Sequence, residues 1–115
     1  MFLNTNNKFI WKNGSFEKWE DTSVHILSHT MHYGTGVFEG LRAYKTNNGP
    51  AIFRLKDHTN RLFDAASKIS LKIPYSPDEL NHVQKEIFIK NNLAEGYLRP
   101  IVFLGSESLG IRATE

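Results

Sequence analysis

The first regular pattern in the chain is typical of a β-hairpin. Two short segments with apolar and aromatic side chains, Phe9–Lys12 and Ser15–Trp19, are separated by Asn13-Gly14. An Asn-Gly pair tolerates the positive φ angles that a tight primed turn requires. We therefore expect a hairpin over residues 9–19. The following stretch, from Asp21 to Thr35, is rich in histidine, and we interpret it as irregular.

Alternation with a period of two residues predicts the next strands. Between Gly36 and Thr46 one face would carry Val37, Leu41 and Ala43, and the other Phe38, Gly40, Arg42 and Tyr44. Residues 47–50 have the composition of a turn, and residues 51–55 that of the return strand of an antiparallel pair. A last strand is expected from Tyr97 to Leu104, followed by a glycine-containing loop from Gly105 to Ile111.

Apolar residues at helical spacing predict two helices between these strands. The first runs from about Lys56 to Ser70, with a buried stripe of Leu62, Ala65, Ala66 and Ile69. The second starts at Ser76, which can cap the helix, with Pro77 at the first helical position and Glu79 where a capping box needs it. Its expected stripe is Leu80, Val83 and Ile87, and it ends near Asn91-Asn92. These elements give an α+β fold, an antiparallel sheet layered with two helices.

The length of the chain fits one domain, residues 1–115. Forty per cent of the residues are hydrophobic, which is enough for a core and argues against a disordered chain. The chain reaches Glu115 without a natural closing element, so we expect it to be one part of a longer protein.

Charge and cysteine content remove several classes of function. The 14 Lys and Arg residues against 12 Asp and Glu residues give a net charge of +2, and the basic residues are scattered, so we expect no nucleic-acid partner. The absence of cysteine excludes disulfides and thiolate chemistry. The sequence has no apolar run long enough for a signal peptide or a membrane span, so we expect a cytoplasmic protein without a membrane partner.

Gly40 is the first residue with a possible functional role. It lies inside the alternating run, on the same predicted face as Phe38, where glycine is costly because it loses the most backbone entropy. A missing side chain leaves a gap for another part of the backbone or for a ligand. A β-bulge or close strand packing explains the same residue without any ligand.

Tyr97-Leu98-Arg99-Pro100 is the second candidate. Alternation places Tyr97 and Arg99 on one face of a strand, where a phenol and a guanidinium could converge on a carboxylate. Pro100 removes a backbone donor, so the strand should lie at an edge or be locally irregular. A surface arginine beside a half-buried tyrosine is the alternative interpretation.

Arg61 and the histidines have plainer local interpretations. Arg61 lies in a predicted helix, where a solvated surface charge is usual. His25, His29 and His32 would need a helix to face one another, and Tyr33-Gly34-Thr35-Gly36 argues against a helix there. No carboxylate-rich motif accompanies them, so structural roles are favoured over a metal site.

Taken in order, these segments resemble the fold type IV pyridoxal-phosphate enzymes, and among them the branched-chain amino acid aminotransferases. The resemblance covers nearly the whole chain, and its specificity comes from the order and spacing of segments that are individually weak. These segments are residues 10–14, Ser28-His29, residues 32–35, residues 37–42, residues 49–54, His58, Arg61-Leu62 and residues 97–100.

The resemblance implies a role for each candidate residue. Arg61 would bind the phosphate of pyridoxal 5'-phosphate. Tyr33 and Phe38 would be walls of the substrate pocket, with Gly40 the small residue beside it. Tyr97 would contribute to carboxylate binding, and Arg99 would engage the distal carboxylate of glutamate. Leu109 and Ile111 would belong to a loop that enters the pocket of a neighbouring subunit, which implies at least a homodimer.

The chemistry implied is the transfer of an amino group between leucine, isoleucine or valine and 2-oxoglutarate. The lysine that holds the cofactor covalently would lie in a second, larger domain, and none of the nine lysines of this chain stands in the corresponding motif. The chain would therefore supply binding residues and no catalytic residue, and would be inactive alone.

Three alternatives stay open. A D-amino acid aminotransferase or an aminodeoxychorismate lyase would have the same fold type, although Phe38–Arg42 together with Tyr97 and Arg99 favours the branched-chain group. A non-catalytic self-association domain belongs to a different class, and in that case the natural protein would end near Glu115.

Overall fold

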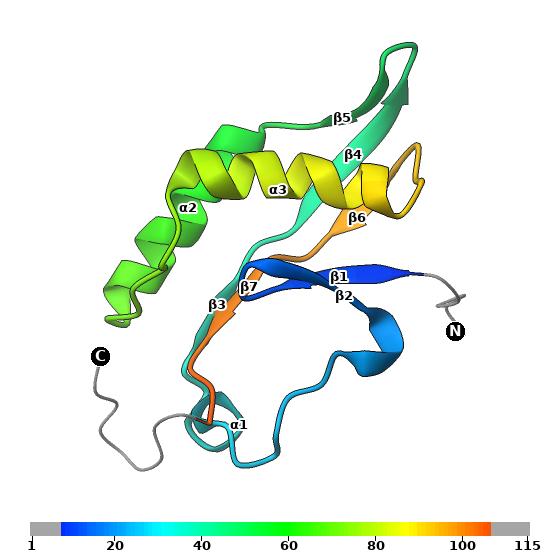
Figure 1. The fold of residues 1–115 in the computed structure, drawn as a ribbon. Helices are drawn as coiled ribbons and strands as arrows, with labels where there is room; N and C mark the ends of the chain where they lie inside the picture. Colours follow the sequence, from blue (N-terminus) through cyan, green and yellow to red (C-terminus); the bar gives the residue numbers. More distant parts are fainter. Residues whose placement is uncertain (1–7, 107–115) are drawn as a thin grey trace.

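The computed structural model describes residues 8–106, in which strands and short helices precede two long helices and two further strands (Figure 1). The elements are β1 (Phe9–Lys12), β2 (Ser15–Lys18), a 3-10 helix (Trp19–Asp21), α1 (His29–Tyr33), β3 (Gly36–Phe38), β4 (Leu41–Thr46), β5 (Gly49–Ile52), α2 (Leu55–Lys68), α3 (Pro77–Lys90), β6 (Gly96–Leu98) and β7 (Ile101–Phe103). The strand pairs of the described residues are antiparallel, and the predicted α+β class is confirmed.

The predicted hairpin is confirmed. β1 pairs with β2, and the turn residues Asn13 and Gly14 have φ angles of 49° and 96°. The side chain of Asn91, directly after α3, accepts a hydrogen bond from the backbone N–H of Phe9 (2.7 Å) and donates one to the Phe9 carbonyl (3.0 Å). The Asn91 amide thus makes the two hydrogen bonds to Phe9 that the backbone of a neighbouring strand would make. These bonds fix the hairpin to the end of α3.

The run from Gly36 to Thr46 is two strands instead of the single strand expected. β3 pairs with β7 and β4 pairs with β6, and both pairs keep one register, since Phe38 faces Ile101 on one side of the interruption and Leu41 faces Leu98 on the other. The backbone N–H of Glu39 donates to the Pro100 carbonyl (3.1 Å), but proline has no N–H to return the bond. The irregularity predicted at Pro100 is therefore confirmed, and it also divides the expected strand from Tyr97 to Leu104 into β6 and β7.

The β4–β5 hairpin turns earlier than predicted. Its turn is centred on residues 47–48, and Gly49, with a φ of 100°, already pairs with Thr46. Pro50 is tolerated within β5 because β5 is the edge strand of its sheet. Leu55 belongs to α2 and not to the strand, since Arg54 (φ 54°) turns the chain into the helix.

Both long helices are confirmed, with different buried stripes. Ser76 caps α3 as predicted, accepting a hydrogen bond from the Glu79 N–H (3.1 Å). The buried positions of α2 are Leu55, Thr59, Leu62 and Ala66, and those of α3 are Leu80, Gln84 and Phe88. Of the predicted stripe residues, Val83 and Ile87 are half-buried, while Ile69 is exposed and lies just after the end of α2. The contact between α2 and α3 also includes polar residues. Gln84 donates to the hydroxyl of Thr59 (3.0 Å), which donates to Asn81 (2.5 Å).

The apolar core lies between the inner face of β4 and the two long helices. Leu41 and Ala43 of β4 are buried together with Leu62 and Ala66 of α2 and with Phe88 of α3. Full burial of a leucine side chain contributes about 1.5–3 kcal/mol. The alternation predicted for β4 is confirmed here, because Arg42 and Tyr44 on the opposite face are exposed.

The stretch interpreted as irregular contains the short helix α1. Its first backbone N–H groups, those of His29 and Thr30, donate to the carbonyls of Gly105 and Leu104 (3.0 Å each). Local sequence could not predict this helix because its donors are satisfied by residues about 75 positions away. In residues 8–106 no helix is long and apolar enough to cross a bilayer.

Candidate functional site

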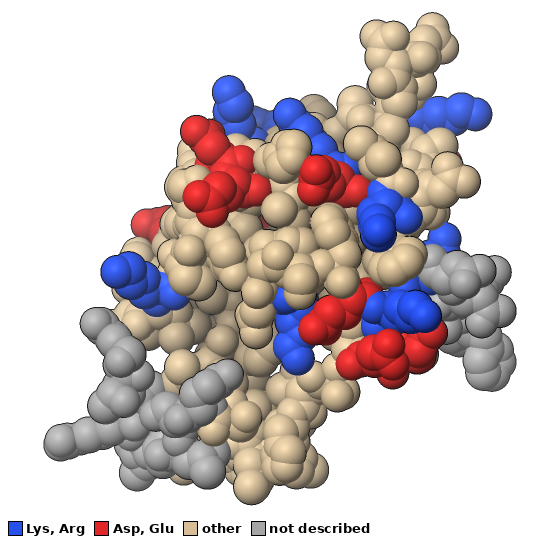
Figure 2. Space-filling model, in the orientation of Figure 1, with Lys and Arg blue, Asp and Glu red and all other residues tan. Residues whose placement is uncertain are grey.

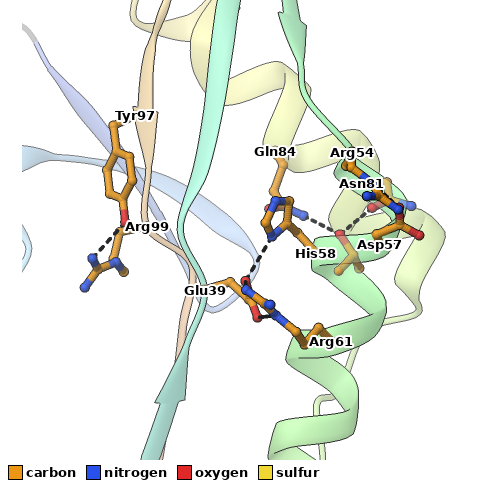
Figure 3. A network of polar contacts seen from close by, with 10 residues as sticks. Glu39, Arg54, Asp57, His58, Arg61, Asn81, Gln84, Tyr97 and Arg99 are labelled. Atoms are coloured by element: carbon orange, nitrogen blue, oxygen red, sulfur yellow. Dashed lines mark hydrogen bonds and ion pairs between the residues drawn. The ribbon is translucent and has the colours of Figure 1, made fainter.

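A buried carboxylate lies at the interruption between β3 and β4. The side chain of Glu39 is 5% exposed and points from the strand toward α2 (Figure 3). A buried charge is retained only when it is paired and hydrogen-bonded. Its partners therefore decide whether this strand can pack against the helix.

Both partners of Glu39 come from one face of α2. Arg61 donates from Nε to one carboxylate oxygen and from Nη2 to the other (2.8 Å), which is a paired, charge-assisted contact. His58 Nδ1 lies 3.0 Å from the oxygen that accepts from Nη2. Positions three residues apart share a helix face, so one turn of α2 presents both groups.

These contacts change the acidity of both members of the pair. The hydrogen bond from Arg61 outweighs the opposing effect of burial and, with a smaller contribution from His58, lowers the pKa of Glu39 from 4.5 to about 2. The same hydrogen bond raises the pKa of Arg61. Glu39 is thus ionised and Arg61 charged at neutral pH.

Arg61 is held on one edge and open on the other. Its side chain is 70% exposed, although Glu39 fixes Nε and Nη2. A guanidinium has five N–H donors, and the two bonds to Glu39 leave three that have no acceptor among residues 8–106. A preorganised, outward-facing guanidinium of this kind fits an anionic group such as a phosphate.

A second cluster lies on the other side of the same strand (Figure 3). Arg99 Nη2 donates to the hydroxyl of Tyr97 at 2.8 Å. The Arg99 guanidinium carbon lies 4.2 Å from the centroid of the Phe38 ring, a cation–π contact. The prediction that Tyr97 and Arg99 share a face is confirmed, and this face presents a second fixed guanidinium.

Gly40 lies beneath the ring of Tyr97. A Cβ atom at Gly40 would lie 2.2 Å from the Tyr97 hydroxyl oxygen and 3.0 Å from Cζ. The gap foreseen at Gly40 is therefore filled by a side chain of the same chain, which agrees with the close-packing interpretation. Phe38, Gly40, Tyr97 and Arg99 are thus brought together.

The remaining predicted residues lie apart or outside the described part of the chain. Tyr33 ends α1, half exposed, and its ring lies 4.5 Å from that of His29. Leu109 and Ile111 lie outside the described residues. Arg61 lies on the opposite side of the strand from Tyr97 and Arg99 (Figure 3).

Sequence reasoning missed Glu39 and the part played by His58. A signal was present in the alternation of residues 36–46. Glu39 is separated from Leu41 and Ala43 by an even number of positions, so it lies on their inward face and is the one carboxylate there. An inward carboxylate needs a cation, and the His58/Arg61 spacing on a predicted helix offers two.

The three clustered histidines make hydrogen bonds within the chain. His29 Nδ1 lies 2.8 Å from the Thr35 hydroxyl, and His32 Nε2 lies 3.0 Å from the Ile26 carbonyl. Within residues 8–106 no three His, Asp or Glu side chains form a group that could hold a metal ion. On the face drawn in Figure 2, Lys and Arg side chains are interspersed with Asp and Glu side chains.

Known proteins are similar to this chain in sequence and in fold. The family model for amino-transferase class IV matches residues 36–115. A branched-chain-amino-acid aminotransferase of Pseudomonas aeruginosa is 52% identical over 91% of this chain and 34% of its own length. The chain spans about a third of the length of the curated relatives it matches.

Solved structures agree with the sequence comparison. The crystal structure of the Escherichia coli branched-chain amino acid aminotransferase superimposes with a TM-score of 0.90 at 41% identity, covering 94% of this chain and 36% of that one. A T.th. branched-chain amino acid aminotransferase complexed with N-(5'-phosphopyridoxyl)-L-glutamate gives a TM-score of 0.88 at 42% identity, with the same coverage.

The Glu39 cluster predicts a specific loss of stability in acid. Because the pKa of Glu39 is depressed to about 2, its contribution is complete above pH 4.5 and is lost as the pH falls from 4.5 to 2. Replacing Glu39→Gln should lower the free energy of unfolding at pH 7 by about 1–3 kcal/mol, the range allowing for screening by water around exposed Arg61. It should also flatten the pH dependence between 4.5 and 2, as measured by urea unfolding.

Glu95→Gln is the control, since Glu95 is exposed. It should retain the wild-type slope in this pH range. An equally steep slope in Glu39→Gln would show that Glu39 is not the group responsible.

Proposed function

Since the chain belongs to the class IV amino-transferases, we propose that the whole protein is a branched-chain amino acid aminotransferase. It exchanges amino groups between leucine, isoleucine or valine and 2-oxoglutarate, using pyridoxal 5'-phosphate. The observation that carries the proposal is the pair of fixed guanidinium groups, Arg61 and Arg99, on either side of one strand interruption. Such a site offers separate positions for a phosphate and a carboxylate, and the relatives of this chain are branched-chain enzymes.

Arg61 holds the cofactor phosphate in this proposal. Its three remaining N–H donors face outward while Glu39 fixes its other edge, so the guanidinium needs no reorganisation to accept an anion. When bound, the cofactor supplies an electron sink for the substrate Cα. The phosphopyridoxyl group in the complex of the T.th. relative supports this choice of cofactor.

Tyr33 and Phe38 are walls of the substrate pocket in this proposal, with Gly40 beside it, and Tyr97 contributes to carboxylate binding. Phe38 is 61% exposed, an unfavourable state for a large apolar residue unless another surface covers it. A branched aliphatic side chain can be held there by burial alone. Arg99 then receives the distal carboxylate of glutamate, so one pocket accepts both apolar and acidic side chains. The L-glutamate moiety in the complex of the T.th. relative supports the acidic case.

The rest of the site comes from other parts of the protein. We assign the lysine that carries the cofactor to a second, larger domain, so that residues 1–115 alone have no turnover. Exposed apolar side chains before and on α1 and on β7 support a covering partner, which we take to be a second copy. These side chains are Ile26 (71% exposed), Met31 (63%) and Ile101 (58%). Leu109 and Ile111 would reach the pocket of that neighbouring subunit.

Turnover of the whole protein tests the function. Leucine with 2-oxoglutarate should give glutamate and the corresponding branched 2-oxo acid, measured by coupled assay. Turnover of D-alanine with no turnover of leucine would favour a D-amino acid aminotransferase, and release of pyruvate from aminodeoxychorismate would favour the lyase. A protein inactive on all three would favour a non-catalytic self-association domain.

The phosphate role of Arg61 predicts a loss of cofactor affinity. Arg61→Ala in the whole protein should raise the dissociation constant of pyridoxal 5'-phosphate roughly tenfold to hundredfold, because a charge-assisted contact is lost. Dialysis followed by absorbance of the retained cofactor measures this.

Lys68→Ala is the matched control. Lys68 is a cation on the same helix, 73% exposed and paired with Asp64. Equal affinity losses in the two variants, or none in Arg61→Ala, would contradict the assignment of Arg61.

A further inference from the structure

Gly40 occupies a position where the backbone does not require glycine. Its φ is not among the positive φ angles of the described glycines, which are those of Gly14, Gly34, Gly49 and Gly96. A positive φ is thus not the reason for glycine at this position. The reason for glycine must therefore lie in the space above it.

That space is taken by the phenol of Tyr97. A Cβ atom at Gly40 would lie 2.2 Å from Oη, 3.0 Å from Cζ and 3.3 Å from Cε2, and the first distance is impossible for a real Cβ. Arg42 faces Tyr97 directly in the β4–β6 register, so Gly40, two residues before Arg42, is the diagonal neighbour on the same face. The Tyr97 ring extends along this diagonal, and its hydroxyl occupies the space that a Cβ atom at Gly40 would fill. We call this space above Gly40 the notch.

The seated phenol in turn holds Arg99. The Tyr97 hydroxyl accepts from Arg99 Nη2 at 2.8 Å, while the guanidinium carbon lies 4.2 Å from the Phe38 ring centroid. A long exposed arginine otherwise samples many rotamers and loses that freedom when it binds a ligand. The hydrogen bond to Tyr97 and the cation–π contact with Phe38 together fix the direction of the Arg99 guanidinium. The hydrogen bond depends on the position of the Tyr97 phenol.

We propose that Gly40 is a specificity-determining position that acts through Tyr97 to aim Arg99 at an acidic substrate. This inference rests on the proposed function and deepens it, because it assigns Gly40 a positioning role instead of substrate contact. Any side chain at Gly40 displaces the phenol and removes the acceptor that fixes Arg99. The consequence falls more heavily on substrates that need a distal carboxylate bound at Arg99 than on those held by burial against Phe38.

The kinetic test compares glutamate with leucine in the whole protein. Gly40→Ala should raise the ratio of the KM for glutamate to the KM for leucine roughly tenfold to hundredfold, as expected for loss of a charged hydrogen bond that glutamate alone uses. Tyr97→Phe should show the same selectivity, because it removes only the acceptor oxygen. An equal rise for both substrates in both variants would overturn the role of Gly40 in specificity.

Two variants serve as matched controls. Gly36→Ala adds a methyl group near Thr30 and Val102, away from Tyr97. Tyr44→Phe removes a hydroxyl from a tyrosine 54% exposed, against 55% for Tyr97. Neither control should change the ratio of the two KM values, and a change in either as large as that of Gly40→Ala would overturn the proposal.

A double-mutant cycle tests the notch without reference to any substrate. With the Tyr97 oxygen removed, the nearest ring atom would be Cζ at 3.0 Å, which a small movement can accommodate. The loss of unfolding free energy caused by Gly40→Ala should therefore be smaller in the Tyr97→Phe background, measured by urea unfolding. If the losses of unfolding free energy in the two single variants simply add in the double variant, the Tyr97 hydroxyl does not occupy the notch.

The two tests separate failure of this inference from failure of the proposed function. A whole protein that does not turn over leucine would refute the function, while the cycle would still decide whether Tyr97 occupies the notch. Coupling in the cycle combined with unchanged KM ratios would refute the role in specificity alone. If Gly40→Ala does not fold, Tyr97→Phe alone still decides whether the phenol positions Arg99.

Discussion

Pro100 has no N–H to donate across to Glu39, and the ladder that joins β3–β4 to β6–β7 is interrupted where these residues face each other. The register survives the interruption, so the side chains still alternate. Glu39 consequently faces α2 and Gly40 faces the opposite side. Two adjacent residues at the interruption between β3 and β4 thus organise two clusters on opposite faces.

The two clusters share one physical design. In each, a guanidinium is held by an acceptor of the same chain, the Glu39 carboxylate for Arg61 and the Tyr97 hydroxyl for Arg99. Each guanidinium keeps donors for a ligand, and the cost of fixing a long side chain falls on folding instead of binding. The acceptors differ in strength, because a buried carboxylate binds a cation more tightly than a phenol does. The arrangement suits a permanent cofactor at Arg61 and an exchanging substrate at Arg99.

Features with local causes could be predicted from the sequence. The turn at Asn13-Gly14 and the helix start at Ser76 depend on residues within three positions of each other, and both were predicted correctly. Features with distant causes could not. Helix α1 depends on carbonyls at Leu104 and Gly105, and the stripe of α3 includes Gln84 because Thr59 offers it a partner.

The residues of the candidate site also divide into those that local sequence could predict and those that depend on distant partners. Alternation alone placed Tyr97 beside Arg99, whereas the filling of the gap at Gly40 required knowledge of which strand pairs with β4. Arg61 had no local signal of function, because its partner Glu39 is 22 residues away. Resemblance to a family assigned Arg61 a role, and the structure adds what holds it in place.

A crystal structure of the whole protein with a phosphopyridoxyl-glutamate ligand tests the central account most directly. The account predicts that Arg61, still held by Glu39, lies within hydrogen-bond distance of a phosphate oxygen. It also predicts that Arg99, still bound to Tyr97, contacts the distal carboxylate of glutamate. A ligand whose phosphate and carboxylate both lie away from these guanidinium groups would contradict it.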